Sequence, residues 1–115
     1  MTTDSPLRTR LRAALLDARR ARDAEAASTL RTALAALENA EAVPTTDATA
    51  GALEDAPLGV GVTEAARRVL SDADELAVLE AEIASLQEAG RAYACSVPER
   101  AVAARRAAER LSALR

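Results

Sequence analysis

The side chains best suited to chemistry in this chain are its arginines, because all 15 basic residues are Arg and there is no Lys or His. A guanidinium group binds the oxygens of a phosphate or carboxylate through two parallel hydrogen bonds. Clustered arginines therefore indicate a phosphate-binding surface, although the same pattern is typical of a solvated helix face with ion pairs between successive turns. The candidate tRNA- or partner-binding arginines are Arg19, Arg20, Arg22, Arg31, Arg67 and Arg68, with a further row at Arg100, Arg105, Arg106 and Arg110.

The acidic residues and the single cysteine offer weaker chemistry. Acidic pairs can serve general acid/base catalysis when burial separates their pKa values, but here solvation or helix capping explains each pair. Cys95 has no His in the chain to activate it as a nucleophile, so we expect a partly buried structural thiol. No catalytic residue, metal-ligand set or cofactor is expected. The acidic pairs are Glu38 and Glu41, Asp72 and Asp74, and Glu80 and Glu82.

Composition narrows the kinds of nucleic-acid contact that the chain can make. Tyr93 is its one aromatic residue, and proteins that bind single strands stack bases on aromatic side chains, so contacts with the phosphate backbone and its shape are expected instead. The net charge of −3 argues against a general polyanion binder. Residues 1–40 hold seven Arg and five acids, residues 41–90 two and eleven, and residues 91–115 six and two. The ends are thus basic and the middle is acidic.

Apolar residues that recur every three or four positions predict two amphipathic helices in the first part of the chain. The first covers residues 6–22, where Asp4 or Ser5 precedes Pro6 as the expected start. Asp23 is the expected cap of the second, and the two helices are expected to form an antiparallel hairpin. The expected core positions are Leu7, Leu11, Ala14, Leu15 and Ala18, and then Ala27, Leu30, Leu34 and Leu37.

Two more helices are predicted in the last part of the chain. Ser71 and Asp74 form a capping-box pattern at the start of the third helix. The fourth follows CSVPER and is expected to fold back on the third as a second hairpin. The expected core positions are Leu76, Leu79, Ile83, Leu86, Gly90 and Tyr93, and then Ala101, Ala104, Ala108, Leu111 and either Ala113 or Leu114.

The stretch between the hairpins lacks a sustained period. Residues 44–62 are rich in Pro, Gly, Thr and Ala, which predicts a linker, and residues 63–70 fit a helical turn or an extended connector. We therefore expect an all-α protein with one hairpin over residues 1–43, a linker and connector over 44–70, and a second hairpin over 71–115. Asn39 is a poor residue for a helix interior, so it is expected either to contact a partner or to mark helix termination before Pro44.

Three stretches resemble the GatB/YqeY family in the order found there. ARDAEAASTLRTALAALENAEA at residues 21–42 is similar to the N-terminal signature of that family, and GVGVTEAARRVLSDADELAVLEAEI at residues 59–83 to its second block. GRAYA, then PERA and an Arg-rich helix, resemble its close. The likeness is greatest to short stand-alone members from GC-rich actinobacteria.

The resemblance implies a helical domain like the C-terminal tail of the B subunit of the glutamine-dependent aminoacyl-tRNA amidotransferase, which holds the tRNA. Family descriptions attach carbon–nitrogen ligase activity with glutamine as the amide donor. This chain has no kinase-like cradle, metal ligands or amidase domain, so it is not expected to catalyse amide transfer alone.

The expected function is therefore a non-catalytic module that binds tRNA or amidotransferase subunits, with Arg19, Arg20, Arg22, Arg31, Asn39, Arg67 and Arg68 at the binding surface. The alternative is a protein-interaction or structural domain, including a homodimer in which the acidic middle of one chain meets the basic ends of another. The N-terminal stretch lacks an apolar signal-peptide core and no run is long enough to span a membrane, so a cytoplasmic protein with no membrane partner is expected.

Overall fold

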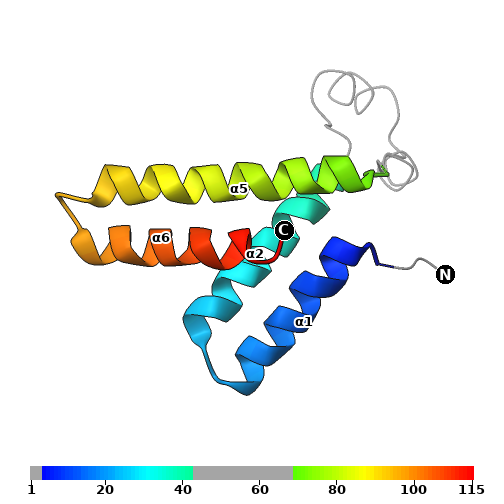
Figure 1. Cartoon of the computed structure of the whole chain (residues 1–115), viewed down its shortest axis with the longest axis horizontal. Coiled ribbons are helices and arrows are strands. Elements are labelled where there is room, and N and C mark those ends of the chain that lie inside the picture. The colour runs from blue at the N-terminus through cyan, green and yellow to red at the C-terminus, as the bar shows by residue number, and fades with distance from the viewer. Residues whose placement is uncertain (1–3, 43–68) are drawn as a thin grey trace, which may run out of the picture.

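The computed structural model describes residues 4–42 and 69–115, and the regular structure of that part is helical (Figure 1). The helices are α1 (Pro6–Arg20), α2 (Ala24–Glu41), α5 (Asp72–Tyr93) and α6 (Pro98–Ser112). The predicted all-α class with two helical hairpins is confirmed. The linker predicted over residues 44–62 lies outside the described residues, as do residues 63–68 of the connector. None of the described helices has the length and apolar content needed to cross a bilayer.

A side-chain cap explains where α1 begins. Of the two candidates, Ser5 is the cap: its Oγ accepts a hydrogen bond from the N–H of Arg8 at 3.1 Å. Pro6 takes the first helical position, where no backbone donor is needed. Asp4 instead accepts a hydrogen bond from Nε of Arg12. The serine therefore fixes the start of the helix, and the aspartate pairs across its first turns.

The predicted caps of α2 and α5 are also confirmed. Oδ1 of Asp23 accepts a hydrogen bond from the N–H of Ala26 at 3.0 Å. Ser71 and Asp74 form a capping box, in which each side chain accepts a hydrogen bond from the other residue's backbone N–H, at 3.0 and 3.1 Å. Each cap satisfies a backbone donor that the helix leaves without an intrahelical partner.

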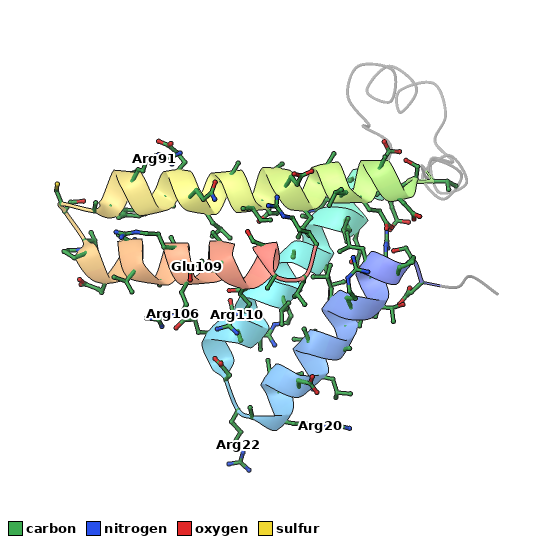
Figure 2. The ribbon with its side chains drawn as sticks, in the orientation of Figure 1. Arg20, Arg22, Arg91, Arg106, Glu109 and Arg110 are labelled. Atoms are coloured by element: carbon green, nitrogen blue, oxygen red, sulfur yellow. The ribbon has the colours of Figure 1, made fainter. Side chains whose placement is uncertain are left out.

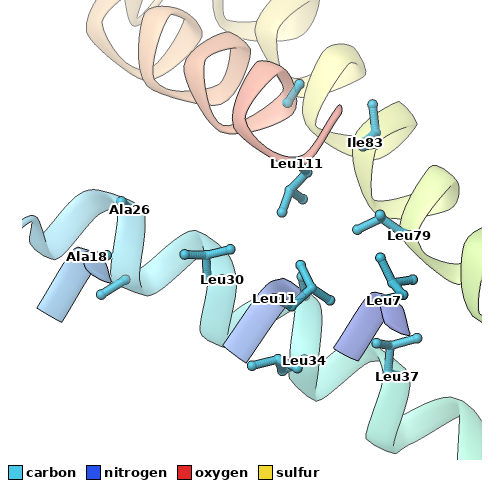
Figure 3. Packing of buried hydrophobic residues seen from close by; sticks show 13 residues of the cluster. Leu7, Leu11, Ala18, Ala26, Leu30, Leu34, Leu37, Leu79, Ile83 and Leu111 are labelled. Carbon is cyan, nitrogen blue, oxygen red and sulfur yellow. The ribbon is translucent and has the colours of Figure 1, made fainter. Parts of the chain in front are cut away.

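The two hairpins share one hydrophobic core. α5 and α6 run antiparallel and pack most extensively against each other, and α2 contacts α1, α5 and α6 (Figure 1). Leucine, isoleucine and alanine side chains from all four helices meet in one cluster (Figure 3). α2 packs against α1 of its own hairpin and against α5 and α6 of the other. The apolar faces of the two hairpins are therefore buried against each other. The buried members are Leu7, Leu11, Ala18, Ala26, Ala27, Leu30, Ala33, Leu34, Leu37, Leu79, Ile83, Ala108 and Leu111.

The predicted core stripes are largely confirmed, although the stripe of α2 omits the buried Ala26 and Ala33, and the second hairpin holds further exceptions. Leu76 was expected in the core, but it is 39% exposed, and the neighbouring Glu75 is 4% exposed. Ala113 is exposed and Leu114 is partly buried, which decides between those two alternatives. Ala107 is buried although the stripe omitted it. Apolar spacing identifies a helix face, but it does not show where a charged partner on another helix draws an acidic residue inward.

Glu75 is drawn inward by Arg8 of α1. Nε of Arg8 donates a hydrogen bond to Oε2 of Glu75 at 2.8 Å, and a second nitrogen of Arg8 lies 2.8 Å from Oε1 of Glu41. The side chains of Arg8, Glu75 and Glu41 are only 13%, 5% and 23% exposed. Burial acts to lower the pKa of Arg8, but hydrogen bonds to both carboxylates and their charges outweigh it and raise that pKa. This triad, in which Glu75 is buried and Arg8 and Glu41 are partly buried, joins the start of α1 to the end of α2 and the start of α5.

Gly90 allows α6 to approach α5 closely. A Cβ atom at this position would lie 2.9 Å from Cγ of Arg105 and 3.6 Å from the carbonyl oxygen of Ala101. The Arg105 stem therefore lies over bare helix backbone, which is why a glycine occupies this position of the predicted stripe.

Candidate nucleic-acid interface

Four arginines lie around the turn between α1 and α2, and we call Arg19, Arg20, Arg22 and Arg31 the arginine tip. Arg19 and Arg20 end α1, Arg22 lies in the turn, and Arg31 follows about two turns into α2. All four side chains are exposed. Figure 2 shows Arg20 and Arg22 at the end of the first hairpin, pointing away from the second. The cations at the end of α1 also suit the negative end of its dipole.

The turn holds Arg22 in a backbone conformation that favours glycine. The φ angle of Arg22 is 57°. The N–H of Asp23 donates to the carbonyl of Ala18 at 2.8 Å, and the N–H of Arg22 donates to the carbonyl of Arg19 at 3.1 Å. These two bonds form a Schellman motif, in which glycine is the usual left-handed residue. An arginine there presents a guanidinium group at the tip at a cost in backbone stability.

Arg22→Gly is expected to raise the free energy of unfolding by up to about 1.6 kcal/mol. The left-handed conformation costs a side chain roughly 1 to 2 kcal/mol, and the greater freedom of glycine in the unfolded chain cancels about 0.4 to 1 kcal/mol of that gain. Urea unfolding followed by circular dichroism measures the change. Arg20→Gly is the control, because it places glycine at a helical position and is expected to lower stability. Equal losses in both variants would contradict the assigned cost.

Three of the tip arginines line one open hollow. Arg19, Arg22 and Arg31 surround a space of about 380 Å³ together with Asp23. The rest of its wall is formed by alanines of the two helices. Arg20 lies outside this lining but next to Arg19 in the chain. The arrangement suits an anionic group that several guanidinium groups approach at once.

The tip arginines have no anionic partner within the described residues. None of the four makes a salt bridge or a side-chain hydrogen bond there, whereas most of the other described arginines pair with a carboxylate. Arg10 bonds the backbone carbonyl of Leu114, Arg100 lies over the ring of Tyr93, and Arg105 has no partner among the described residues either. The carboxylate pairs are Arg8 with Glu41 and Glu75, Arg12 with Asp4, Arg91 with Glu88, Arg106 with Glu25, Arg110 with Asp23, and Arg115 with Glu80. The tip is therefore a local concentration of uncompensated positive charge in a chain whose net charge is −3.

The acidic residues beside the tip are held by α6. Glu25 lies 2.9 Å from a terminal nitrogen of Arg106, and Asp23 lies 4.0 Å from a terminal nitrogen of Arg110. In Figure 2 these two arginines reach from α6 toward the first hairpin. Asp17 is also nearby, but it lines the groove between α1, α2 and α6 rather than the arginine hollow. That groove has a volume of about 620 Å³ and a floor of alanine and leucine.

The other predicted binding residues do not join the tip. Arg67 and Arg68 lie outside the described residues. Asn39 is exposed near the end of α2, about 22 Å along the helix from Ala24. Its carbonyl accepts a hydrogen bond from the N–H of Ala42 at 3.2 Å, so Asn39 lies where α2 ends before Pro44. The structure thus brings together Arg19, Arg22 and Arg31, with Arg20 beside them.

Cys95 corrects one expectation from the sequence. It was expected to be partly buried, but it is exposed in the turn between α5 and α6. α5 and α6 pack against each other along their lengths, and the turn that joins their ends projects beyond this contact into solvent. Within residues 4–42 and 69–115, no group of three or more Cys, Asp or Glu side chains is arranged to hold a metal ion.

Comparison of the chain with protein-family models, with curated proteins and with solved structures finds no match. The resemblance to the GatB/YqeY family therefore stays a prediction.

Proposed function

We propose that this chain is a non-catalytic RNA-binding module whose arginine tip binds the phosphate backbone. The observation that carries the proposal is that Arg19, Arg22 and Arg31 line one hollow, exposed and without an anionic partner in the described residues. A phosphate is a suitable ligand for such a group, because its oxygens match the paired N–H donors of guanidinium.

The position of the aromatic residue favours backbone contacts over base stacking. Tyr93, the one aromatic residue of the chain, lies at the end of α5 in the other hairpin. The guanidinium carbon of Arg100 lies 5.7 Å from the centre of its ring. The arginine tip therefore has no aromatic side chain on which a base can stack, and binding to an RNA stem through its phosphates is the expected mode.

We propose that the RNA is transfer RNA, because the chain resembles the GatB/YqeY family. The stretch that resembles the family signature, residues 21–42, contains Arg22 and Arg31 of the tip. The proposed role is to hold tRNA in the cytoplasm, alone or with amidotransferase subunits that supply the carbon–nitrogen ligase chemistry.

Salt dependence tests the proposal. We expect labelled tRNA to bind the full chain in fluorescence anisotropy, with log affinity falling linearly as log salt rises between about 50 and about 200 mM. Arg19→Gln with Arg31→Gln is expected to weaken binding and to reduce the slope by up to about 1.8, because each lost phosphate contact removes about 0.9.

The matched control removes two charges elsewhere. Arg12→Gln with Arg91→Gln changes two arginines that pair with Asp4 and Glu88, and it should leave the slope nearly unchanged. Duplex DNA of equal length should bind more weakly than tRNA. No tRNA binding even at low salt would overturn the proposal and favour the alternative of a protein-interaction domain, for which the groove lined by α1, α2 and α6 is the candidate surface.

A further inference from the structure

The start of α2 places two carboxylates next to the phosphate site proposed above. Asp23 lines the arginine hollow itself, and Glu25 lies in the first turn of the same helix. Unpaired carboxylates there would attract the tip arginines and repel a phosphate. Both carboxylates instead face arginines of α6, which belongs to the other hairpin.

We infer that Arg106 and Arg110 of α6 are positioning residues, which pair with Glu25 and Asp23, offset their negative charge beside the arginine tip and so set its affinity for phosphate without touching the ligand. The inference rests on the proposed function. The tip arginines come from the first hairpin, and α6 of the second hairpin influences the electrostatic potential at the tip.

The contacts of Glu25 support this role most directly. One terminal nitrogen of Arg106 lies 2.9 Å and 3.2 Å from its two carboxylate oxygens, so both oxygens are engaged by one guanidinium group. Glu25 lies in the first turn of α2, two residues after Asp23, which lines the arginine hollow, so a carboxylate released from Arg106 adds its negative charge beside the tip. The ion pair between Arg106 and Glu25 therefore keeps the Glu25 carboxylate from offsetting the positive charge of the arginine tip.

Asp23 is held from two sides. Its Oδ1 accepts the capping hydrogen bond from Ala26, and its Oδ2 faces a terminal nitrogen of Arg110 at 4.0 Å. Asp23 lines both the arginine hollow and the groove beside α6, as does Ala18, so it is the charged residue that the two spaces share. Nε of Arg110 is buried with no hydrogen-bond partner among the described residues, so that side chain is directed into the interface between the hairpins.

A charge-pair cycle on Arg106 and Glu25 tests the inference, with labelled tRNA as the probe and full-length protein. Arg106→Gln is expected to weaken binding about two- to fivefold, the size expected for one uncompensated charge several ångströms from a phosphate in a solvent-exposed setting. Glu25→Gln alone is expected to leave binding equal or tighter. The double variant is expected to return to within about twofold of the wild-type affinity, with an unchanged salt slope.

Other results would overturn the inference. A double variant that stays as weak as Arg106→Gln and loses about 0.9 of salt slope would mean that Arg106 contacts phosphate directly. No effect of Arg106→Gln would mean that Glu25 does not influence the tip. The pair of Arg91 and Glu88 on α5 provides the same substitutions elsewhere on the surface and should change nothing. Circular dichroism checks that each variant folds.

Failure of the proposed function gives a different result. If wild-type protein does not bind tRNA at all, the proposed function fails and the inference with it. If wild-type binding depends on Arg19 and Arg31 but the double variant shows no rescue, only the role of Arg106 is overturned.

Discussion

Replacing Arg8 with methionine is expected to lower the free energy of unfolding by about 3 kcal/mol, the lower end of the usual result of removing one partner from a buried ionic group, because Arg8 and Glu41 are partly exposed. The side chain of Arg8 is 13% exposed and contacts Glu41 and Glu75 at 2.8 Å each. Without it, two carboxylates remain in a largely desolvated site. The loss is large for a domain of this size, whose total stability is typically about 5 to 15 kcal/mol.

The triad already contains more negative than positive charge. Arg8 carries one positive charge against two carboxylates, and Oε1 of Glu75 is buried without a hydrogen-bond partner among the described residues. Losing Arg8 therefore removes the favourable charge within the triad and leaves its desolvation cost in place. Because Glu41 ends α2 and Glu75 begins α5, the loss is expected to loosen the contact between the hairpins.

Urea unfolding of Arg8→Met against wild type measures this effect. Arg12→Met is the control on the same helix, because Arg12 and Asp4 are about half exposed and such a pair contributes less than about 1 kcal/mol. Adding Glu41→Gln and Glu75→Leu to Arg8→Met is expected to restore most of the stability, since an apolar replacement of a whole buried ionic group is often neutral. Equal small losses in Arg8→Met and Arg12→Met would show that the triad is hydrated.

Replacing Leu11 with alanine is expected to lower the free energy of unfolding by about 2.7 to 5 kcal/mol. Leu11 of α1 is fully buried in the cluster that all four helices share (Figure 3). The substitution removes apolar surface from the core and leaves a cavity, because helices tied through both hairpins cannot collapse freely around it.

Leu16→Ala is the matched control for this prediction. Leu16 lies on the same helix, but it is 47% exposed, and a substitution there is expected to change stability by no more than about 0.5 kcal/mol. Thermal or urea unfolding of the two variants separates the faces of α1. Comparable losses would contradict the assignment of its buried face.

Part of the candidate site was predictable from the sequence. The clustering of Arg19, Arg20 and Arg22 and the cap at Asp23 both appear within a few residues, so they indicated a basic turn between two helices. The role of Arg106 was not predictable. Its pair with Glu25 spans 81 residues, and nothing local distinguishes it from the other arginines of the last helix.

The helices and their approximate limits can be predicted from the amino-acid sequence alone. Caps such as Ser5 and Ser71 act on backbone groups three residues away, and an apolar stripe depends on a period of 3.6 residues, so both are local properties. For the same reason the stripes predicted for α1 and α2 contain most of the observed core of those helices, although they omit Ala26 and Ala33.

Only the tertiary structure decided which charges are paired and which are left free. Glu75 is buried and Leu76 is exposed because the crossing of the hairpins places Arg8 beside α5. The tip arginines are uncompensated because the same packing brings α6 to Glu25 and Asp23. Such pairings depend on distances between residues far apart in the chain, which helical periodicity does not specify.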